Sequence, residues 1–253
     1  MNIDKSVLVT GAARGIGRRI AVDLARDGYA VAVVDVDFEC YREFAAEGLD
    51  DTVAAELEAL GAPVLSTQAE TTDRAALDGL VTRIREEWGG LNAVVCNAGG
   101  GSGPLDGNRA SQIDLDDLDT VMRRNLHGTV TTVTAALPAL RGSTNASVVT
   151  MGSVTGVEVT GSGGYAHYGI SKAAVMHYTR YLAKDLAPQG IRANCVAPGP
   201  IATGRARQRI GEVPNKEELL ARIGTPGDVS GLVRYLVSED SAFMSGQVVH
   251  LYR

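Results

Sequence analysis

A tyrosine and a lysine stand four residues apart in the segment Tyr168-Gly169-Ile170-Ser171-Lys172. Residues at this spacing share one face of a helix, so the phenol and the ammonium group lie next to each other. An isolated tyrosine has a pKa of about 10, so acting as a base at pH 7 requires roughly 4 kcal/mol of help. A solvent-exposed ion pair supplies less than about 1 kcal/mol. The pair is therefore an acid–base catalyst if it lies in a water-poor cleft, and an ordinary solvated pair if it lies on an open helix face.

The N-terminal segment predicts a strand, a glycine-rich turn and a helix, in that order. An apolar run at 6–10 suits a buried parallel strand and leads into GAARGIG at 11–17. Gly11 allows backbone angles closed to other residues, Gly15 lets the chain approach a pyrophosphate, and Gly17 lets the following helix pack on the sheet. The amides at the start of that helix would point at phosphate groups. This arrangement predicts a dinucleotide site.

A carboxylate follows the second predicted strand at the position that such a site requires. The apolar run 30–34 ends at Asp35, eighteen residues after Gly17. A carboxylate there accepts hydrogen bonds from the adenosine ribose hydroxyls, which makes the glycine pattern more specific than it would be alone.

The rest of the chain repeats the alternation of strand and helix. Apolar runs near residues 6, 30, 63, 92, 146 and 191 are separated by longer amphipathic segments. This pattern predicts an α/β fold with a parallel sheet and helices on both faces, in one domain over 1–253. With 253 residues, 45% of them hydrophobic, the chain is long enough to bury one sizeable core.

Composition also limits the partners. A net charge of -6 without a basic patch argues against nucleic acid. No apolar stretch approaches the ~20 residues needed to cross a membrane, and nothing before Ser6 looks like a signal peptide, so we expect a cytoplasmic protein. The cysteines Cys40, Cys96 and Cys195 lack metal-ligand spacing, and we expect no metal site and reduced structural thiols.

Six features in a fixed order resemble the short-chain dehydrogenase/reductase family over essentially the whole chain. They are Thr10-Gly11 with Gly15 and Gly17, Asn97-Ala98-Gly99, Asn125, Ser153, Tyr168 with Lys172, and the segment Pro198 to Thr203. The resemblance implies a Rossmann fold, a doubly wound parallel sheet of about seven strands in the order 3-2-1-4-5-6-7. It also implies a substrate lid at about 203–225 and a homotetramer or homodimer.

The resemblance further implies hydride transfer between a nicotinamide cofactor and a secondary alcohol or ketone. Tyr168 would exchange the proton with the substrate oxygen, and Ser153 would hydrogen-bond that oxygen. Lys172 would lower the pKa of the phenol and hold the nicotinamide ribose. Asn125 would hold a water that links Lys172 to solvent, using its side-chain amide and a disturbance of its helix.

The implied cofactor residues fall on the glycine turn, the strand ends and the two later motifs. They are Gly11, Arg14, Gly15, Ile16, Gly17, Asp35, Glu70, Thr71, Asn97, Ala98, Gly99, Tyr168, Lys172, Pro198, Gly199, Ile201 and Thr203. Asp35 would repel the 2′-phosphate of NADP and thus favours NAD. Arg14 argues the other way, because a basic residue there meets that phosphate in some relatives, but it is able to swing into solvent. Glu70 stands where relatives commonly have an aspartate that receives the adenine amino group.

Two other functions remain open. A reductase of carrier-bound 3-oxoacyl groups would resemble this chain closely but would prefer NADPH, and Asp35 argues against it. A nucleotide-binding regulator would keep the glycine turn without needing Ser153, Tyr168 and Lys172 together.

Several segments have no assigned role. The connection 37–50 is longer than the usual ~2–6 residues, and it either folds over the adenosine end of the cofactor or decorates the surface. Arg205, Arg207 and Arg209 either receive an anionic group, with at most two pointing inward, or form a solvated lid.

Two histidines and a second tyrosine lie close to the proposed catalytic residues in the sequence. His127 and His167 are expected to pack or hydrogen-bond, because the proton donor is already assigned. Tyr165 is a rival phenol without a lysine partner, since position 169 is glycine. The end of the chain, 246–253, lacks the glycine pair of the relatives, which leaves its contact with the active-site rim open.

Overall fold

The computed structural model of the protein describes residues 3–44, 47–211, 220 and 222–252, with the backbone alone at 209 and 210. Seven strands form one sheet in the order β3-β2-β1-β4-β5-β6-β7, and every neighbouring pair is parallel. The strands are β1 Ser6–Thr10, β2 Ala30–Asp35, β3 Val64–Gln68, β4 Ala93–Cys96, β5 Ser147–Met151, β6 Arg192–Pro198 and β7 Val248–Leu251. The predicted doubly wound sheet and its strand order are confirmed.

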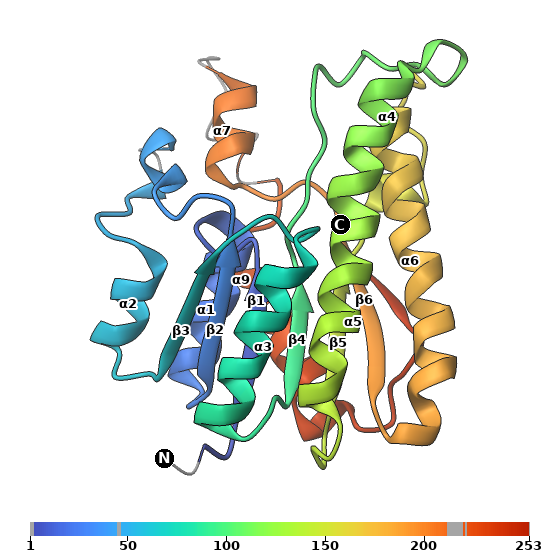
Figure 1. Ribbon diagram of the computed structural model, residues 1–253. Coiled ribbons are helices and arrows are strands. Elements are labelled where there is room, and N and C mark those ends of the chain that lie inside the picture. The colour runs from blue at the N-terminus through green and yellow to red at the C-terminus, as the bar shows by residue number, and fades with distance from the viewer. Residues whose placement is uncertain (1–2, 45–46, 212–219, 221, 253) are drawn as a thin grey trace.

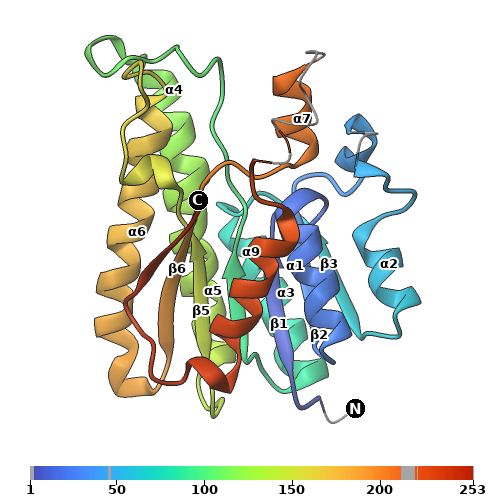
Figure 2. The same ribbon diagram turned by 180° about the vertical axis from the view of Figure 1, so that it is seen from behind.

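Helices cover both faces of this sheet (Figures 1 and 2). Helices α1 and α9 lie together on one face, and α3, α5 and α6 lie on the other. The α-helices are α1 Gly15–Arg26, α2 Val53–Ala59, α3 Arg74–Trp88, α4 Leu115–Met122, α5 Gly128–Leu140, α6 Ala166–Leu186, α7 Gly204–Ile210 and α9 Pro226–Val237. A π-helical turn, Arg123–His127, joins α4 to α5.

Alternate strand residues fill two separate hydrophobic clusters. Val7 and Val9 pack with Ile20 of α1 and Val233 of α9, whereas Leu8 packs on the opposite side with the α3, α5 and α6 residues. Side chains of a strand alternate between faces, and a parallel sheet buries both of them. The apolar runs that predicted the strands are continuous for this reason.

The carboxyl ends of the strands meet at one edge, and the irregular segments gather above it (Figure 1). Above this edge lie the short 3₁₀ helix Cys40–Glu43 and α7. Of the predicted lid at 203–225, residues 212–219 and 221 lie outside the described residues, and the described part returns to the core through a bridge between Ile201 and Gly224. None of the helices in the described part of the chain is long and apolar enough to cross a bilayer.

Candidate active site

A cleft of about 1370 Å³ opens at the carboxyl edge of the sheet and brings most of the sequence-predicted residues together. Those that line it are Gly11, Arg14, Gly15, Ile16, Asp35, Glu70, Thr71, Asn97, Ala98, Gly99, Ser153, Tyr168, Lys172, Pro198, Gly199, Ile201 and Thr203. Gly17 and Asn125 are buried behind these lining residues. Ligand clefts of doubly wound sheets lie at this edge.

The glycine turn is packed tightly against the end of β4. Gly11 has a φ of 66°, and a Cβ there would lie 2.7 Å from the Cα of Ala98. A Cβ on Gly17 would overlap the carbonyl oxygen of Gly11. The side-chain amide of Asn97 donates to the carbonyl oxygens of Thr10 (3.2 Å) and Gly11 (2.9 Å). These contacts fix the backbone path that leads into α1.

Asp35 ends β2 and is anchored to the same turn. Its Oδ2 accepts from the backbone amide of Ala13 and its Oδ1 from that of Val36, both at 2.8 Å. Burial raises the pKa of this carboxyl, and the two amide hydrogen bonds oppose the rise. The carboxylate is therefore held in place before any ligand arrives.

Arg14 differs from the expectation that it swings into solvent. Its guanidinium lies over the ring of Phe44, 3.9 Å from the ring centroid. Phe44 belongs to the long 37–50 connection, and Cys40, Glu43 and Phe44 all line the cleft. A cation above an aromatic face is attracted by the ring quadrupole. This connection therefore forms a wall of the cleft at its Asp35 end, and Arg14 holds it there.

Lys172 is buried at the other end of the cleft, with 4% of its surface exposed. Its Nζ donates to the carbonyl oxygen of Met151 at 2.7 Å and lies 5.8 Å from the centroid of the Tyr168 ring. Burial lowers the pKa of the ammonium group to about 8. The water-poor surroundings that the sequence argument required are thus present around the lysine.

Ser153 lies at the end of β5 and also faces this part of the cleft. Its hydroxyl is 2.9 Å from the hydroxyl of Thr155 and accepts from the Thr155 amide at 3.3 Å. Tyr168 is half-buried in the first turn of α6. The cleft therefore holds a hydroxyl from the segment directly after β5, and a phenol and an ammonium group from α6.

Asn125 lies in the π-helical turn, which is the predicted disturbance of the helix. Its Oδ1 accepts from the Gly100 amide at 2.8 Å, while its Nδ2 donates to the hydroxyl of Ser171 at 2.8 Å and to the Gly100 carbonyl at 3.3 Å. The Thr129 hydroxyl donates to its backbone carbonyl at 2.7 Å. Both amide hydrogens are used, so the side chain ties the Gly99-Gly100 segment to α6. The expected water link stays a prediction.

The structure adds Tyr165, which sequence reasoning did not place in the site. Tyr165 has a φ of 59° in the left-handed region and is buried. Its ring centroid lies 5.2 Å from that of Tyr168 and 5.1 Å from that of His167. His167 is fully buried, and its Nε2 lies 3.2 Å from the Ser102 carbonyl oxygen. These two residues pack the loop after β4 onto the start of α6. The spacing of residues in the sequence contains no signal that predicts this packing.

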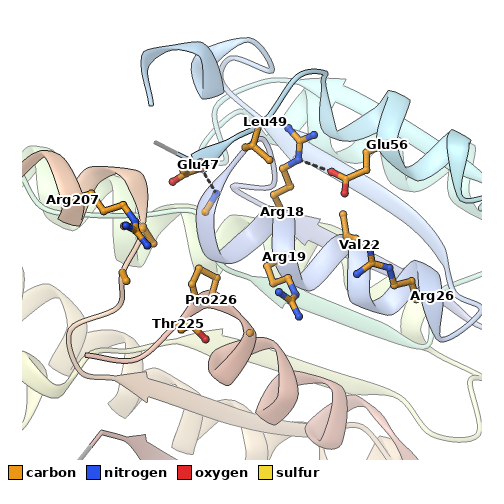
Figure 3. A pocket seen from close by; sticks show the side chains of 14 residues that line it. Arg18, Arg19, Val22, Arg26, Glu47, Leu49, Glu56, Arg207, Thr225 and Pro226 are labelled. Atoms are coloured by element: carbon orange, nitrogen blue, oxygen red, sulfur yellow. Dashed lines mark hydrogen bonds and ion pairs between the residues drawn. The ribbon is translucent and has the colours of Figure 1, made fainter. Parts of the chain in front are cut away.

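The remaining candidates are divided between two cavities and the surface. Arg205 lines the cleft, Arg207 lines a smaller cavity of about 350 Å³ beside α1 (Figure 3), and the side chain of Arg209 lies outside the described residues. Glu70 lines the cleft, is exposed, and accepts from the Thr72 hydroxyl at 3.1 Å.

The last residues do reach the rim. The Tyr252 hydroxyl donates to Glu158 Oε1 at 2.5 Å, and the Leu251 carbonyl accepts from the Gly199 amide at 3.0 Å. Cys96 and Cys195 are buried in β4 and β6, whereas His127 is exposed.

Known proteins share this arrangement. The sequence model of a family described as Enoyl-(Acyl carrier protein) reductase matches residues 11–251. A cyclohexanol dehydrogenase from Rhodococcus sp. (strain TK6) is 43% identical over 97% of this chain and 93% of its own length. The chain belongs to the short-chain dehydrogenase/reductase family. It is an oxidoreductase that transfers hydride between a nicotinamide cofactor and a secondary alcohol or ketone.

Solved structures of family members superpose closely on this short-chain dehydrogenase/reductase. A 3-oxoacyl-[acyl-carrier protein] reductase with bound NAD from Brucella melitensis has a TM-score of 0.79 at 29% identity, covering 98% of this chain and 91% of the other. A short chain dehydrogenase from Burkholderia cenocepacia in complex with NADP has a TM-score of 0.80 at 31% identity, covering 99% and 97%. The family thus includes binders of either cofactor on this fold.

Proposed function

We propose that this enzyme oxidises apolar secondary alcohols of about the size of a six-membered ring, with NAD, and reduces the matching ketones. The observation that carries the proposal is the buried Lys172 ammonium beside the Tyr168 ring, with Ser153 in the same cleft. Leu105, Val154 and Ile223 also line the cleft and give it apolar surface. The 43% identity with a cyclohexanol dehydrogenase supports the same class of substrate.

The described residues fit a dinucleotide. No backbone atom closes the space beside Gly15, because a Cβ there would meet only the Thr203 and Glu47 side chains, at 3.5 Å or more. The first amides of α1 face this space, as a pyrophosphate requires. Asp35 lines the same cleft, where its carboxylate would accept hydrogen bonds from the adenosine ribose. Gly11 and Ala98 also line the cleft and pack against each other.

The proposed chemistry assigns one task to each polar side chain. When bound, the nicotinamide ring takes up the hydride in oxidation and returns it in reduction. The Tyr168 oxygen accepts the proton of the substrate hydroxyl, and the Ser153 hydroxyl donates a hydrogen bond to the same substrate oxygen. The Lys172 charge stabilises the phenolate form of Tyr168, with more effect than in water because the ammonium is buried. Asn125 keeps Gly100 and Ser171 in place around these groups.

NAD preference is proposed from Asp35, whose carboxylate would repel the 2′-phosphate of NADP. Arg14 opposes this preference with its positive charge in the same cleft, but in the free protein its guanidinium is held on the Phe44 ring. We expect the wild type to bind NADH more tightly than NADPH. Asp35→Ser should narrow the difference by about tenfold or more, through weaker NADH binding and stronger NADPH binding. Fluorescence titration with both reduced cofactors measures this, and tighter NADPH binding by the wild type would contradict it.

The function is tested by steady-state turnover with two substrate and cofactor pairs. We expect cyclohexanol with NAD to give a rate well above that of acetoacetyl thioester with NADPH, read as absorbance of the reduced cofactor. The second pair represents the alternative, a reductase of carrier-bound 3-oxoacyl groups, which the superposition on the Brucella melitensis reductase favours. A faster reaction with the thioester would replace the proposed function with this alternative.

A further inference from the structure

Glu47 lines the smaller cavity beside α1 (Figure 3), and its carboxylate bridges two backbone amides that lie far apart in the sequence. Its Oε2 accepts from the Gly15 amide at 3.2 Å, and its Oε1 accepts from the Gly204 amide at 2.5 Å. Gly15 is the first residue of α1, and Gly204 is the first residue of α7. One side chain from the 37–50 connection therefore joins the glycine turn to the segment that follows β6.

The start of α1 has no other acidic partner among the described residues. Arg14, the residue before the helix, makes no side-chain cap, and the first turn contains no acidic residue. A negative charge at a helix N-terminus is stabilised by the unpaired amides and the helix dipole. Glu47 supplies that charge from a different segment.

This carboxylate lies on the side of the glycine turn that neighbouring backbone leaves open. A Cβ added to Gly15 would approach only Thr203, at 3.5 Å, and Glu47 Oε1, at 3.8 Å, whereas Gly11 and Gly17 are closed off by backbone. A pyrophosphate approaches the first helical amide from its open side. Gly15 and Thr203 line both the cleft and the smaller cavity, so Glu47, which lines the smaller cavity, holds the Gly15 amide at the boundary where the cofactor phosphates would reach it.

Two further contacts keep the 37–50 connection in this position. The Gln208 side-chain amide of α7 donates to the Glu43 carbonyl oxygen at 2.8 Å. The Arg14 guanidinium lies on the Phe44 ring, and a Cβ on Gly204 would lie 2.6 Å from the Cβ of Phe44. The connection is therefore docked on both the glycine turn and α7.

We propose that Glu47 is an internal competitor of the cofactor pyrophosphate. In the cofactor-free protein its carboxylate occupies the anion position at the Gly15 amide, and a dinucleotide binds by displacing it. The same displacement breaks the contact with Gly204, so cofactor entry frees the start of α7 from the 37–50 connection. This proposal rests on the dinucleotide binding described above, and it makes Glu47 a residue that weakens cofactor binding.

Titration calorimetry with ADP and with adenosine tests the proposal, because the two ligands differ only in the pyrophosphate group. Glu47→Gln keeps the size of the side chain, removes its charge and leaves one acceptor oxygen for the two amides; a neutral acceptor is roughly half as strong as a charged one. We expect this variant to bind ADP with a Kd about fivefold lower than that of the wild type, and to bind adenosine within about twofold. NADH, followed by fluorescence, should gain affinity as ADP does.

Glu39→Gln is the matched control. It removes the same charge from the same connection, where Glu39 is exposed and pairs with Arg42, and we expect both Kd values to stay within about twofold. Equal or weaker ADP binding by Glu47→Gln would overturn the competitor role, and so would an equal gain for adenosine. If the wild type binds neither ADP nor NADH, dinucleotide binding itself is wrong, which is a different result.

Discussion

At the scale of one residue, the buried charge of Lys172 assists the proposed chemistry but lowers the stability of the folded chain. Its buried ammonium group donates a hydrogen bond to a neutral acceptor, the carbonyl oxygen of Met151. Desolvation disfavours the charged form, so its pKa falls from 10.5 to about 8. The positive charge that would assist the Tyr168 phenolate therefore carries a desolvation cost, which reduces the free energy of unfolding.

This cost predicts a pH dependence of stability. Below pH 8 both the folded and the unfolded chain hold the proton, and the folded state bears the whole cost. Between about pH 8 and 10.5 the unfolded chain binds the proton and the folded chain does not, so stability rises with pH. The fall of the Lys172 pKa from 10.5 to about 8 corresponds to about 3 kcal/mol.

We therefore expect the free energy of unfolding of the wild type, relative to Lys172→Met, to increase by about 3 kcal/mol from pH 7.5 to 10.5. Urea unfolding of both proteins without cofactor measures the difference, in which the titration of groups remote from Lys172 cancels. A difference that stays constant with pH would mean that Lys172 is not desolvated in the folded chain.

The assignment of the proton to Tyr168 is tested against its neighbour Tyr165. We expect Tyr168→Phe to lower kcat by about a thousandfold, because general acid–base catalysis contributes about 10²–10⁴. NADH affinity should stay within about twofold, since the ring still packs. Tyr165→Phe keeps a ring 5.2 Å from that of Tyr168 and should retain most of the activity. Loss of activity in Tyr165→Phe with retention in Tyr168→Phe would exchange their roles.

At the scale of elements, the junction of β1 and α1 requires glycine at positions where a side chain would collide with neighbouring backbone. We expect Gly17→Ala to weaken NADH binding and to destabilise the fold by about 1–3 kcal/mol, because the new methyl group would overlap the Gly11 carbonyl. Gly231→Ala is the control, since Gly231 lies inside α9 with no atom within 4 Å of the added Cβ. That variant should gain about 0.5–1 kcal/mol. Thermal unfolding compares the stabilities of the two variants, and NADH titration compares their affinities for the cofactor. Equal stability of the two variants would contradict the packing argument.

Local patterns in the sequence were sufficient for six of the seven strands, with β7 missing from the apolar runs, and the family resemblance supplied the strand order and most of the site residues that were predicted. Apolar runs mark the inner strands β1, β4, β5 and β6, which are buried on both faces, and the glycines at 11 and 17 are dictated by close backbone contacts near them. These signals are short-range, which is why a single sequence carries them.

The contacts that were not predicted join segments remote in the chain. Glu47 meets Gly204 across 157 positions, and the Arg14 guanidinium meets Phe44 only because the long connection after β2 returns to the glycine turn. The left-handed backbone of Tyr165 likewise depends on the loop after β4, whose Gly107 carbonyl accepts from the Tyr165 amide at 2.7 Å. Tertiary packing decides such features, and composition or periodicity does not encode them.

At the scale of the whole molecule, one edge of the sheet suggests where copies of the chain would meet. Strand β7 pairs with β6 and ends the sheet order. Between α9 and β7, the Phe243 side chain is fully exposed, and Tyr235 of α9 is 40% exposed. An edge strand, preceded in the chain by segments with exposed aromatic side chains, favours association with another chain.

The family resemblance predicts a homotetramer or homodimer, and this edge gives that prediction a location. We expect light scattering at micromolar protein to give a mass of two or four chains, and Phe243→Asp to lower it, because a charge in an apolar interface remains desolvated and unpaired. Leu60→Asp, which places the same charge on a 43% exposed leucine beyond α2, should leave the mass unchanged. A wild-type mass near one chain would contradict association altogether. A reduced mass in the Leu60 variant alone would move the interface to the opposite end of the sheet, next to β3.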